Sequence, residues 1–232
     1  MDKREQLLNQ EYHGAMRTSA RAQRVEPFYV MEMAKSAAAI AREAAGTDRP
    51  MIYLNIGEPD FTAPPLVAEA AQRAIQGRRT QYTQATGLPQ LRERISGWYA
   101  ERFGLAIPAR RIVVTAGASA ALQLACLALI EAGDELLMPD PSYPCNRQFV
   151  SMAEGRAVLL PSTPAERFQL SAAKVREAWG PHTRGVLLAS PSNPTGTSIH
   201  PQELARIHEV VAERGGITLI DEIYLGLSYD DT

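Results

Sequence analysis

The chain has 232 residues, of which 45% are hydrophobic and 22% charged, so it can form one large α/β domain or two small ones. Its formal net charge of -2 excludes a broad basic surface, and nucleic acid is not an expected partner. No run reaches membrane-spanning length, and Cys126 and Cys145 have neither metal-ligand nor C-x-x-C spacing. These features favour a reduced, cytoplasmic protein without a membrane or metal partner.

A tail and three helices are predicted in the first 104 residues. Residues 1–24 are polar and arginine-rich without a period, which is typical of a disordered tail or of an arm that lies on a partner. Apolar side chains at helical spacing predict helices from Pro27 to Gly46, from Pro64 to Gly77 and from Pro89 to Gly104. We expect the aromatic side chains of the third helix to be core.

Short apolar runs that alternate with helical stretches predict an α/β fold with a mostly parallel sheet. The helix predicted to end at Gly133 is apolar nearly all round, so we expect it to be buried. The predicted strands are 51–56, 112–115, 135–138, 157–160, 185–189 and 217–220.

Polar side chains follow several of these strands, at the edge where open α/β sheets bind ligands. Asn193 lies between two prolines after the run 185–189, where it either contacts a ligand or caps the next helix. Asp221 follows the last strand directly, so we expect it to be partly buried and to need a cationic or donor partner.

Three further features extend this pattern. Residues 116–119 join a predicted strand to a helix start, which makes an anion site, although Ser119 could also be an ordinary N-cap. Tyr143 lies in the loop 141–144, and Tyr224 follows Asp221 closely. A helix start, an aromatic face, an amide, a carboxylate and a phenol together suit a planar phosphorylated pyridine.

With these segments, the chain resembles the class I/II pyridoxal-phosphate aminotransferases of the aspartate aminotransferase fold (fold type I), from about Ser19 onward. The resemblance implies an arm and small-domain helix over 1–48. It also implies a partial large domain over 49–232, three-layered α/β/α with an incomplete, mostly parallel sheet. The matching segments, in the family's order, are 27–32, 56–61, Tyr82-Thr83 with Gly87-Leu88 and Leu91-Arg92, 115–119, 141–144, 192–196 and 221–224.

The resemblance also implies a role for each matched site residue. Asp221 would keep the pyridine nitrogen of pyridoxal 5'-phosphate protonated, and Tyr143 would stack on the ring. Tyr82 would reach the cofactor phosphate of a neighbouring subunit in a homodimer. The remaining implied contacts are Gly117, Ala118 and Ser119 with the phosphate, Asn193 and Tyr224 with the ring 3-oxygen, and Gly57 and Asn193 with the substrate, Gly57 through its backbone at the carboxylate.

The implied activity is transfer of an amino group between an amino acid and a 2-oxo acid, as part of amino acid metabolism. In this family the Schiff-base lysine and a substrate-binding arginine come later than the segment 221–224. Lys3, Lys35 and Lys174 do not follow a ligand-bearing strand. We therefore expect an amino-terminal portion without a catalytic residue, inactive and weakly folded alone, with no covalent cofactor link and a gap in the sheet beside 112–115.

Two other functions stay open at this point. A β-lyase or a cyclopropane-forming synthase of the same fold would use the same cofactor contacts. A non-catalytic binding or regulatory relative would not need the lysine. The residues that choose the donor amino acid are not identifiable from this sequence.

Overall fold

The computed structural model describes residues 17–57 and 61–227, which divide into two compact units. The sheet unit consists of the described residues of Met1–Pro27 and Ala118–Thr232. The helical unit consists of those of Phe28–Gly117. The domain boundary expected between residues 48 and 49 stays a prediction.

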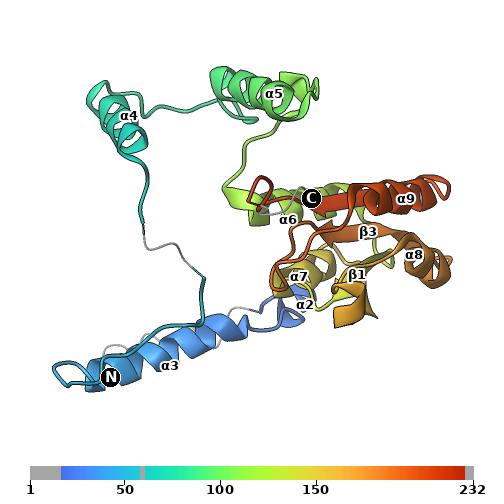
Figure 1. Ribbon diagram of the computed structural model, residues 1–232, viewed down its shortest axis with the longest axis horizontal. Helices are drawn as coiled ribbons and strands as arrows, with labels where there is room; N and C mark the ends of the chain where they lie inside the picture. Colours follow the sequence, from blue (N-terminus) through green and yellow to red (C-terminus); the bar gives the residue numbers. More distant parts are fainter. Residues whose placement is uncertain (1–16, 58–60, 228–232) are drawn as a thin grey trace. The chain divides into compact units, whose positions relative to one another are not determined.

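The helices predicted in the helical unit form at the expected places (Figure 1). They are α3 (Tyr29–Glu43), α4 (Pro65–Gln76) and α5 (Pro89–Phe103). Proline is favoured at the first position of α4 and α5, where the backbone N–H would have no helical partner. Gly104, with φ of 68°, ends α5 in the left-handed conformation that glycine adopts without strain.

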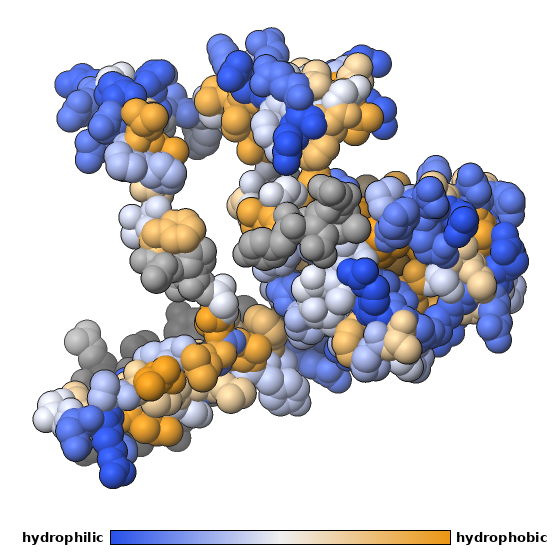
Figure 2. All heavy atoms as spheres, viewed as in Figure 1, coloured by the Kyte–Doolittle hydropathy of each residue, from blue (hydrophilic) through white to orange (hydrophobic). Residues whose placement is uncertain are grey.

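The aromatic side chains of α5 do not form a buried core among the described residues, contrary to the prediction. The Trp98 ring contacts Tyr99 and Phe103 with centroid distances of 5.0 and 5.1 Å. Trp98 is nevertheless 44% exposed, and no residue of α5 is buried. Figure 2 shows apolar side chains open to solvent along α3 as well. The helical periodicity was therefore predictive of the helices but not of what covers them.

Neither strand predicted in the helical unit forms. Residues 51–56 and 112–115 carry no strand pairing. The second run follows the 3-10 helix η1 (Ala109–Arg111) and is held instead by a loop and a side chain. Val114 N donates to Thr86 O at 3.0 Å, and Arg92 Nε donates to Ile112 O at 2.8 Å. A strand needs a neighbouring strand, and among the described residues none pairs with 112–115. The gap predicted beside this run stays a prediction.

The other predicted strands form a four-stranded parallel sheet in the order β2-β1-β3-β4. β1 spans Glu135–Asp140, β2 Arg156–Pro161, β3 Thr183–Ala189 and β4 Ile217–Asp221. The predicted α/β fold with a parallel sheet is thereby confirmed.

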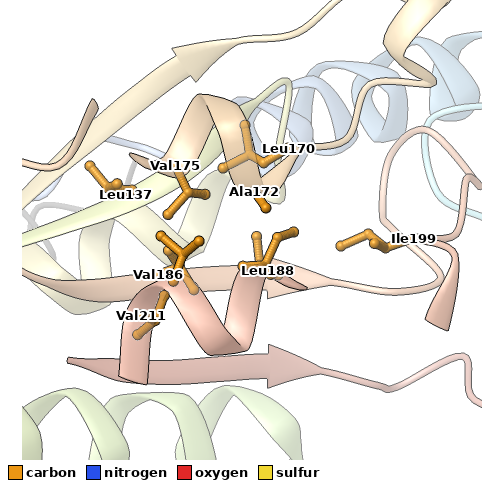
Figure 3. Packing of buried hydrophobic residues seen from close by; sticks show 10 residues of the cluster. Leu137, Leu170, Ala172, Val175, Val186, Leu188, Ile199 and Val211 are labelled. Atoms are coloured by element: carbon orange, nitrogen blue, oxygen red, sulfur yellow. The ribbon is translucent and has the colours of Figure 1, made fainter. Parts of the chain in front are cut away.

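Helices cover both faces of this sheet. One core contains Leu122 and Cys126 of α6, packed with Leu136 of β1 and Leu187 of β3. The opposite core contains side chains of β1, β3, α8 and α9, several of which Figure 3 labels. The helices that cover the sheet are α6 (Gly117–Leu129, whose first residue belongs to the helical unit), α7 (Pro144–Met152), α8 (Ala172–Ala178) and α9 (Pro201–Ala212).

Alternation along the central strand explains the two cores. Val186 and Leu188 point to the face covered by α8 and α9, whereas Leu187 points to the face covered by α6 and α7. All three are buried, as the uninterrupted apolar run predicts for a parallel strand covered on both sides. Gly185 is required here, because a Cβ atom would lie 2.1 Å from the backbone oxygen of Ile217 on β4.

Helix α6 is buried on only one side. Leu122 and Cys126 face the sheet, but Leu124 and Leu127 are 55% and 50% exposed. The expected all-round burial is therefore wrong for the outer side of the helix. Burial raises the pKa of the Cys126 thiol to about 11, so this cysteine is an inert core residue.

Part of the predicted tail is ordered on the sheet unit. Ser19 caps the short helix α2 (Ala20–Gln23) by accepting from Ala22 N at 3.3 Å. Arg21 forms an ion pair with Glu154 at 3.3 Å. The expected disorder is therefore wrong for residues 20–23, while residues 1–16 lie outside the described residues.

Candidate cofactor site at the carboxyl edge of the sheet

The carboxyl ends of β1, β3 and β4 lie side by side at one edge of the sheet. In the parallel register Leu137 pairs with Val186, and Ala189 with Asp221. Ser190 N donates to Asp221 O at 3.1 Å, so the loop after β3 starts directly against the end of β4. The segments that follow these strands carry Tyr143, Asn193 and Asp221. The sheet therefore gathers the side chains that the sequence placed after separate strands.

Asp221 ends β4 with a half-buried carboxylate. Its Oδ1 accepts from Ile223 N at 3.1 Å, which supplies the donor partner that the sequence predicted. Among the described residues, no cationic side chain pairs with this carboxylate. One carboxylate oxygen is thus held by the backbone while the group keeps its capacity to accept from a ligand.

Two phenols lie close to this carboxylate. The pKa of Tyr143 is raised to about 12, chiefly by a hydrogen bond with the Cys145 side chain, then by burial, by Cys145 again, and by the nearby charges of Asp221 and Tyr224. The loop after β1 and the carboxyl end of β4 are therefore near one another. Tyr143 is consequently a neutral, half-buried ring at neutral pH, as a stacking surface requires.

Asn193 lies in the turn that follows β3. The alternative that it caps the next helix is wrong, because His200 is the N-cap of α9 and its Nδ1 accepts from Gln202 N at 3.3 Å. Ser192 N donates to Thr197 O and Gly196 N to Ser192 O, which closes the loop around Asn193. The half-buried amide of Asn193 therefore stays in a constrained loop at the ligand edge.

Ser119 is the third residue of α6 and is not its N-cap, so that alternative is also wrong. The carboxyl end of α6 lies at the opposite edge of the sheet, where Arg184 Nε of β3 donates to Leu129 O at 3.2 Å. A helix of 13 residues rises about 18 Å, comparable to the length of a six-residue strand. The amino terminus of α6, with Ala118 and Ser119, therefore lies toward the same edge as Asp221.

Two predicted contacts belong to the helical unit. Tyr82 is fully exposed and lines an open pocket with Ala74, Arg79 and Leu88. Gly57 is described, but the matching residues 58–60 lie outside the described residues. The predicted roles of Gly57 and Tyr82 stay predictions.

The site includes two residues that the sequence did not identify. Cys145 is the second residue of α7 and hydrogen-bonds to Tyr143. Gln169 is buried and contacts the Asn193 loop from a distant segment. A single sequence carries no signal for either contact, because the first depends on how a helix starts and the second on tertiary packing.

The described residues hold neither a metal cluster nor a membrane-spanning helix. Its His, Cys, Asp and Glu side chains nowhere gather in threes around a possible metal position. Within residues 17–57 and 61–227, no helix is long and apolar enough to cross a membrane.

Comparison with known proteins agrees with this geometry. Residues 49–232 match the family described as aminotransferase class I and II. The chain is 38% identical over 205 residues to the valine–pyruvate aminotransferase of Mycobacterium tuberculosis, covering 88% of this chain and 52% of the relative. It is 35% identical to an aspartate aminotransferase of Rhizobium meliloti, with coverages of 87% and 48%.

Solved structures give the same result. A crystal structure of an aminotransferase from Mycobacterium tuberculosis superposes with a TM-score of 0.85 at 37% identity, covering 94% of this chain and 55% of that one. The aspartate aminotransferase from Thermus thermophilus with maleate gives 0.86 at 30% identity, with coverages of 93% and 56%. The chain belongs to the class I and II aminotransferase family. It spans about half the length of the relatives it matches.

Proposed function

We propose that the complete gene product is a pyridoxal-phosphate-dependent aminotransferase that exchanges an amino group between an amino acid and a 2-oxo acid. The observation that carries the proposal is the convergence of Tyr143, Asp221 and Tyr224 at one sheet edge, with an acceptor carboxylate that no described cation neutralises. Family membership supports the same chemistry.

The donor set of this edge fits pyridoxal phosphate. Asp221 would accept from the protonated ring nitrogen, and the neutral ring of Tyr143 would stack on the pyridine face. Asn193 and Tyr224 would hydrogen-bond the ring oxygen. The phosphate would bind at the start of α6, at Gly117, Ala118 and Ser119, where backbone N–H groups lack helical partners and the helix dipole favours negative charge. When bound, the pyridinium supplies an electron sink.

The residues of this chain contribute binding and electrostatics. Asp221 holds a proton at the ring nitrogen, because an anionic acceptor favours the protonated form of its partner. The backbone N–H of Ile223 keeps that carboxylate in place at 3.1 Å. Tyr143 excludes water from one face of the ring. None of these groups is a base for proton transfer at the substrate.

Both described lysines are already engaged in ion pairs. Lys174 Nζ donates to Glu166 Oε1 at 2.8 Å and to Pro161 O at 2.5 Å. Pro161 ends β2, which is three strand spacings, or roughly 14 Å, from β4. Lys35 is exposed and paired with Glu32 in the helical unit. The proposal accordingly places the lysine of the complete gene product outside the described residues.

The proposal extends to the predicted partners and location. We infer a cytoplasmic homodimer in which Tyr82, fully exposed in the helical unit, reaches the cofactor phosphate of the neighbouring subunit. Gly57, through its backbone, and Asn193 would contact the substrate carboxylate. The relatives are named for valine–pyruvate and for aspartate, so the family supports amino acids as donors without choosing one.

The test is an amino-transfer assay on the complete gene product with a panel of amino acids and 2-oxo acids, in which pyruvate and ammonia release are also measured. We expect Asp221→Ala to lower kcat by roughly 10²–10³-fold, the usual effect of removing one preorganised charged group. Asp134→Ala is the matched control, because Asp134 also accepts a backbone N–H, from Glu131 at 2.9 Å, but lies before β1 at the other edge.

Full amino transfer by Asp221→Ala would refute the role of Asp221. Pyruvate and ammonia release in place of amino transfer would assign the protein to the lyases or cyclopropane-forming synthases. Cofactor binding without turnover of any substrate would favour a regulatory relative.

A further inference from the structure

Gln169 lies outside every segment that the resemblance matches, yet it contacts the loop that carries Asn193. We propose that Gln169 is a positioning residue that clamps the loop 190–197 to the carboxyl end of β3 and thereby fixes the amide of Asn193. The consequence for cofactor binding rests on the function proposed above. The clamp itself rests on the contacts of this side chain.

The Gln169 amide bridges the two ends of the loop. Its Nε2 donates to Ala189 O, the last residue of β3, at 3.3 Å. The same nitrogen donates to Thr197 O at 2.8 Å and approaches Thr197 Oγ1 at 3.2 Å. One NH₂ group thus connects the residue before the loop with a residue after Asn193. Seven residues of chain between these two anchors must then follow a closed path.

A hydrogen-bond donor is required at this position. The backbone oxygens of Ala189 and Thr197 only accept hydrogen bonds, so their buried partner must donate. Gln169 is 7% exposed, and among the described residues its Oε1 has no hydrogen-bond partner. An ionised carboxylate at this position would face these acceptors with no donor of its own. Burying the amide with one of its two polar atoms unsatisfied costs stability, which its two backbone acceptors offset.

The backbone before Gln169 is shaped to insert it. Thr163 and Glu166 form a capping box around η2 (Pro164–Glu166). Arg167 and Phe168 follow with φ of 53° and 55°, a left-handed conformation that costs about 1–2 kcal/mol per non-glycine residue. Such strain persists only where the surroundings determine the conformation. Here it turns the chain inward at Gln169.

The neighbours of the clamp are fixed in the core. Leu170 follows Gln169 directly, and Ile199 follows the loop; both belong to the cluster around Leu188 of β3 (Figure 3). Ile199 N also donates to Ser190 Oγ at 3.0 Å, a second connection across the same loop. The clamp therefore joins segments that cannot move apart without opening the core.

The experiment compares amide hydrogen exchange in the complete gene product and in Gln169→Leu, without cofactor. We expect the loop amides of Ser192 and Gly196, and the amide of Ile199 just after the loop, to exchange about tenfold faster in the variant, since one bridging group is lost. Amides of β1 and β3 should keep their protection. The control is Gln148→Leu, the same substitution on α7, where Gln148 accepts from Glu26 N and, within residues 17–57 and 61–227, from no other group.

A second control variant, destabilised elsewhere in the core, distinguishes the positioning of the loop from a general loss of stability. Val175→Ala weakens the same core without touching the loop, so it should raise exchange throughout the sheet unit and leave the ratio of loop to strand exchange unchanged. If Gln169→Leu behaves like Val175→Ala, or leaves the loop amides unchanged, Gln169 does not act as a clamp.

Pyridoxal phosphate titration completes the test. We expect a roughly tenfold weaker dissociation constant for Gln169→Leu than for Gln148→Leu, because the loop must then be ordered on binding. Equal affinity of the two variants contradicts the link between the clamp and Asn193. If the unmodified protein does not bind the cofactor at all, the proposed function fails, and the exchange ratio still decides whether the clamp exists.

Discussion

Two apolar runs of this chain, 112–115 and 185–189, are similar in sequence and different in structure. Residues 185–189 form most of β3, with Val186, Leu187 and Leu188 almost completely removed from solvent. Residues 112–115 stay unpaired, and Val113 is 55% exposed. Local propensity is alike in the two runs, so the difference must come from their neighbours.

The comparison shows that a strand is determined by its partners. The run 185–189 has β1 on one side, β4 on the other and helices on both faces. In the described part of the chain, the run 112–115 has no strand on either side, and the Thr86 backbone and the Arg92 guanidinium hydrogen-bond to it instead. The site follows the paired run, because Asn193 and Asp221 are positioned by strands that hold one another.

The largest expected effect is on stability. Leu187→Ala should lower the free energy of unfolding of the complete gene product by about 3 kcal/mol, since it removes buried methyl groups and leaves a cavity. Val113→Ala should change it by less than about 0.5 kcal/mol if this run is as exposed there as it is here. Urea denaturation measures both.

Equal losses of unfolding free energy for Leu187→Ala and Val113→Ala would contradict the difference between the two runs. They would show that 112–115 acquires strand partners in the complete gene product, as the family resemblance implies.

A smaller effect concerns the pH dependence of the site. The pKa of Tyr143 is raised to about 12 from its ordinary value of about 10, first by the hydrogen bond with Cys145. The neutral phenol is therefore favoured in the folded state. Its contribution to stability is complete below about pH 10 and is lost as pH rises toward 12.

The titration of Tyr143 is measured by phenolate absorbance as pH rises. The absorbance of Tyr143→Phe is subtracted from that of the unmodified protein, so that the difference belongs to Tyr143. Cys145→Ala should return the titration toward the ordinary value, because it removes the principal cause of the shift. If Tyr143 already titrates near pH 10 in the unmodified protein, the Tyr143–Cys145 contact does not form in solution.

The positions of the helices and strands were largely predictable from the sequence, but what packs against them was not. Prolines at helix starts located α4 and α5, apolar periodicity located α3 and α6, and the apolar runs located the four strands of the sheet. The order of motifs along the chain located Asn193 and Asp221. Burial of α5 and of the outer side of α6 was not predictable, because periodicity indicates which side is apolar without showing what covers it. The role of Gln169 was not predictable from the sequence, because it depends on a turn with positive φ and on a loop 20 to 28 residues away.

The most direct test of the central claim compares the two edges of the sheet. Hydrogen exchange of the complete gene product is measured with and without pyridoxal phosphate. The account predicts slower exchange at the carboxyl edge, in residues 117–120, 141–146, 190–197 and 221–225, and no change at the opposite edge, in 131–135 and 180–184. Protection at the opposite edge, or saturating cofactor binding without protection at the carboxyl edge, would contradict it.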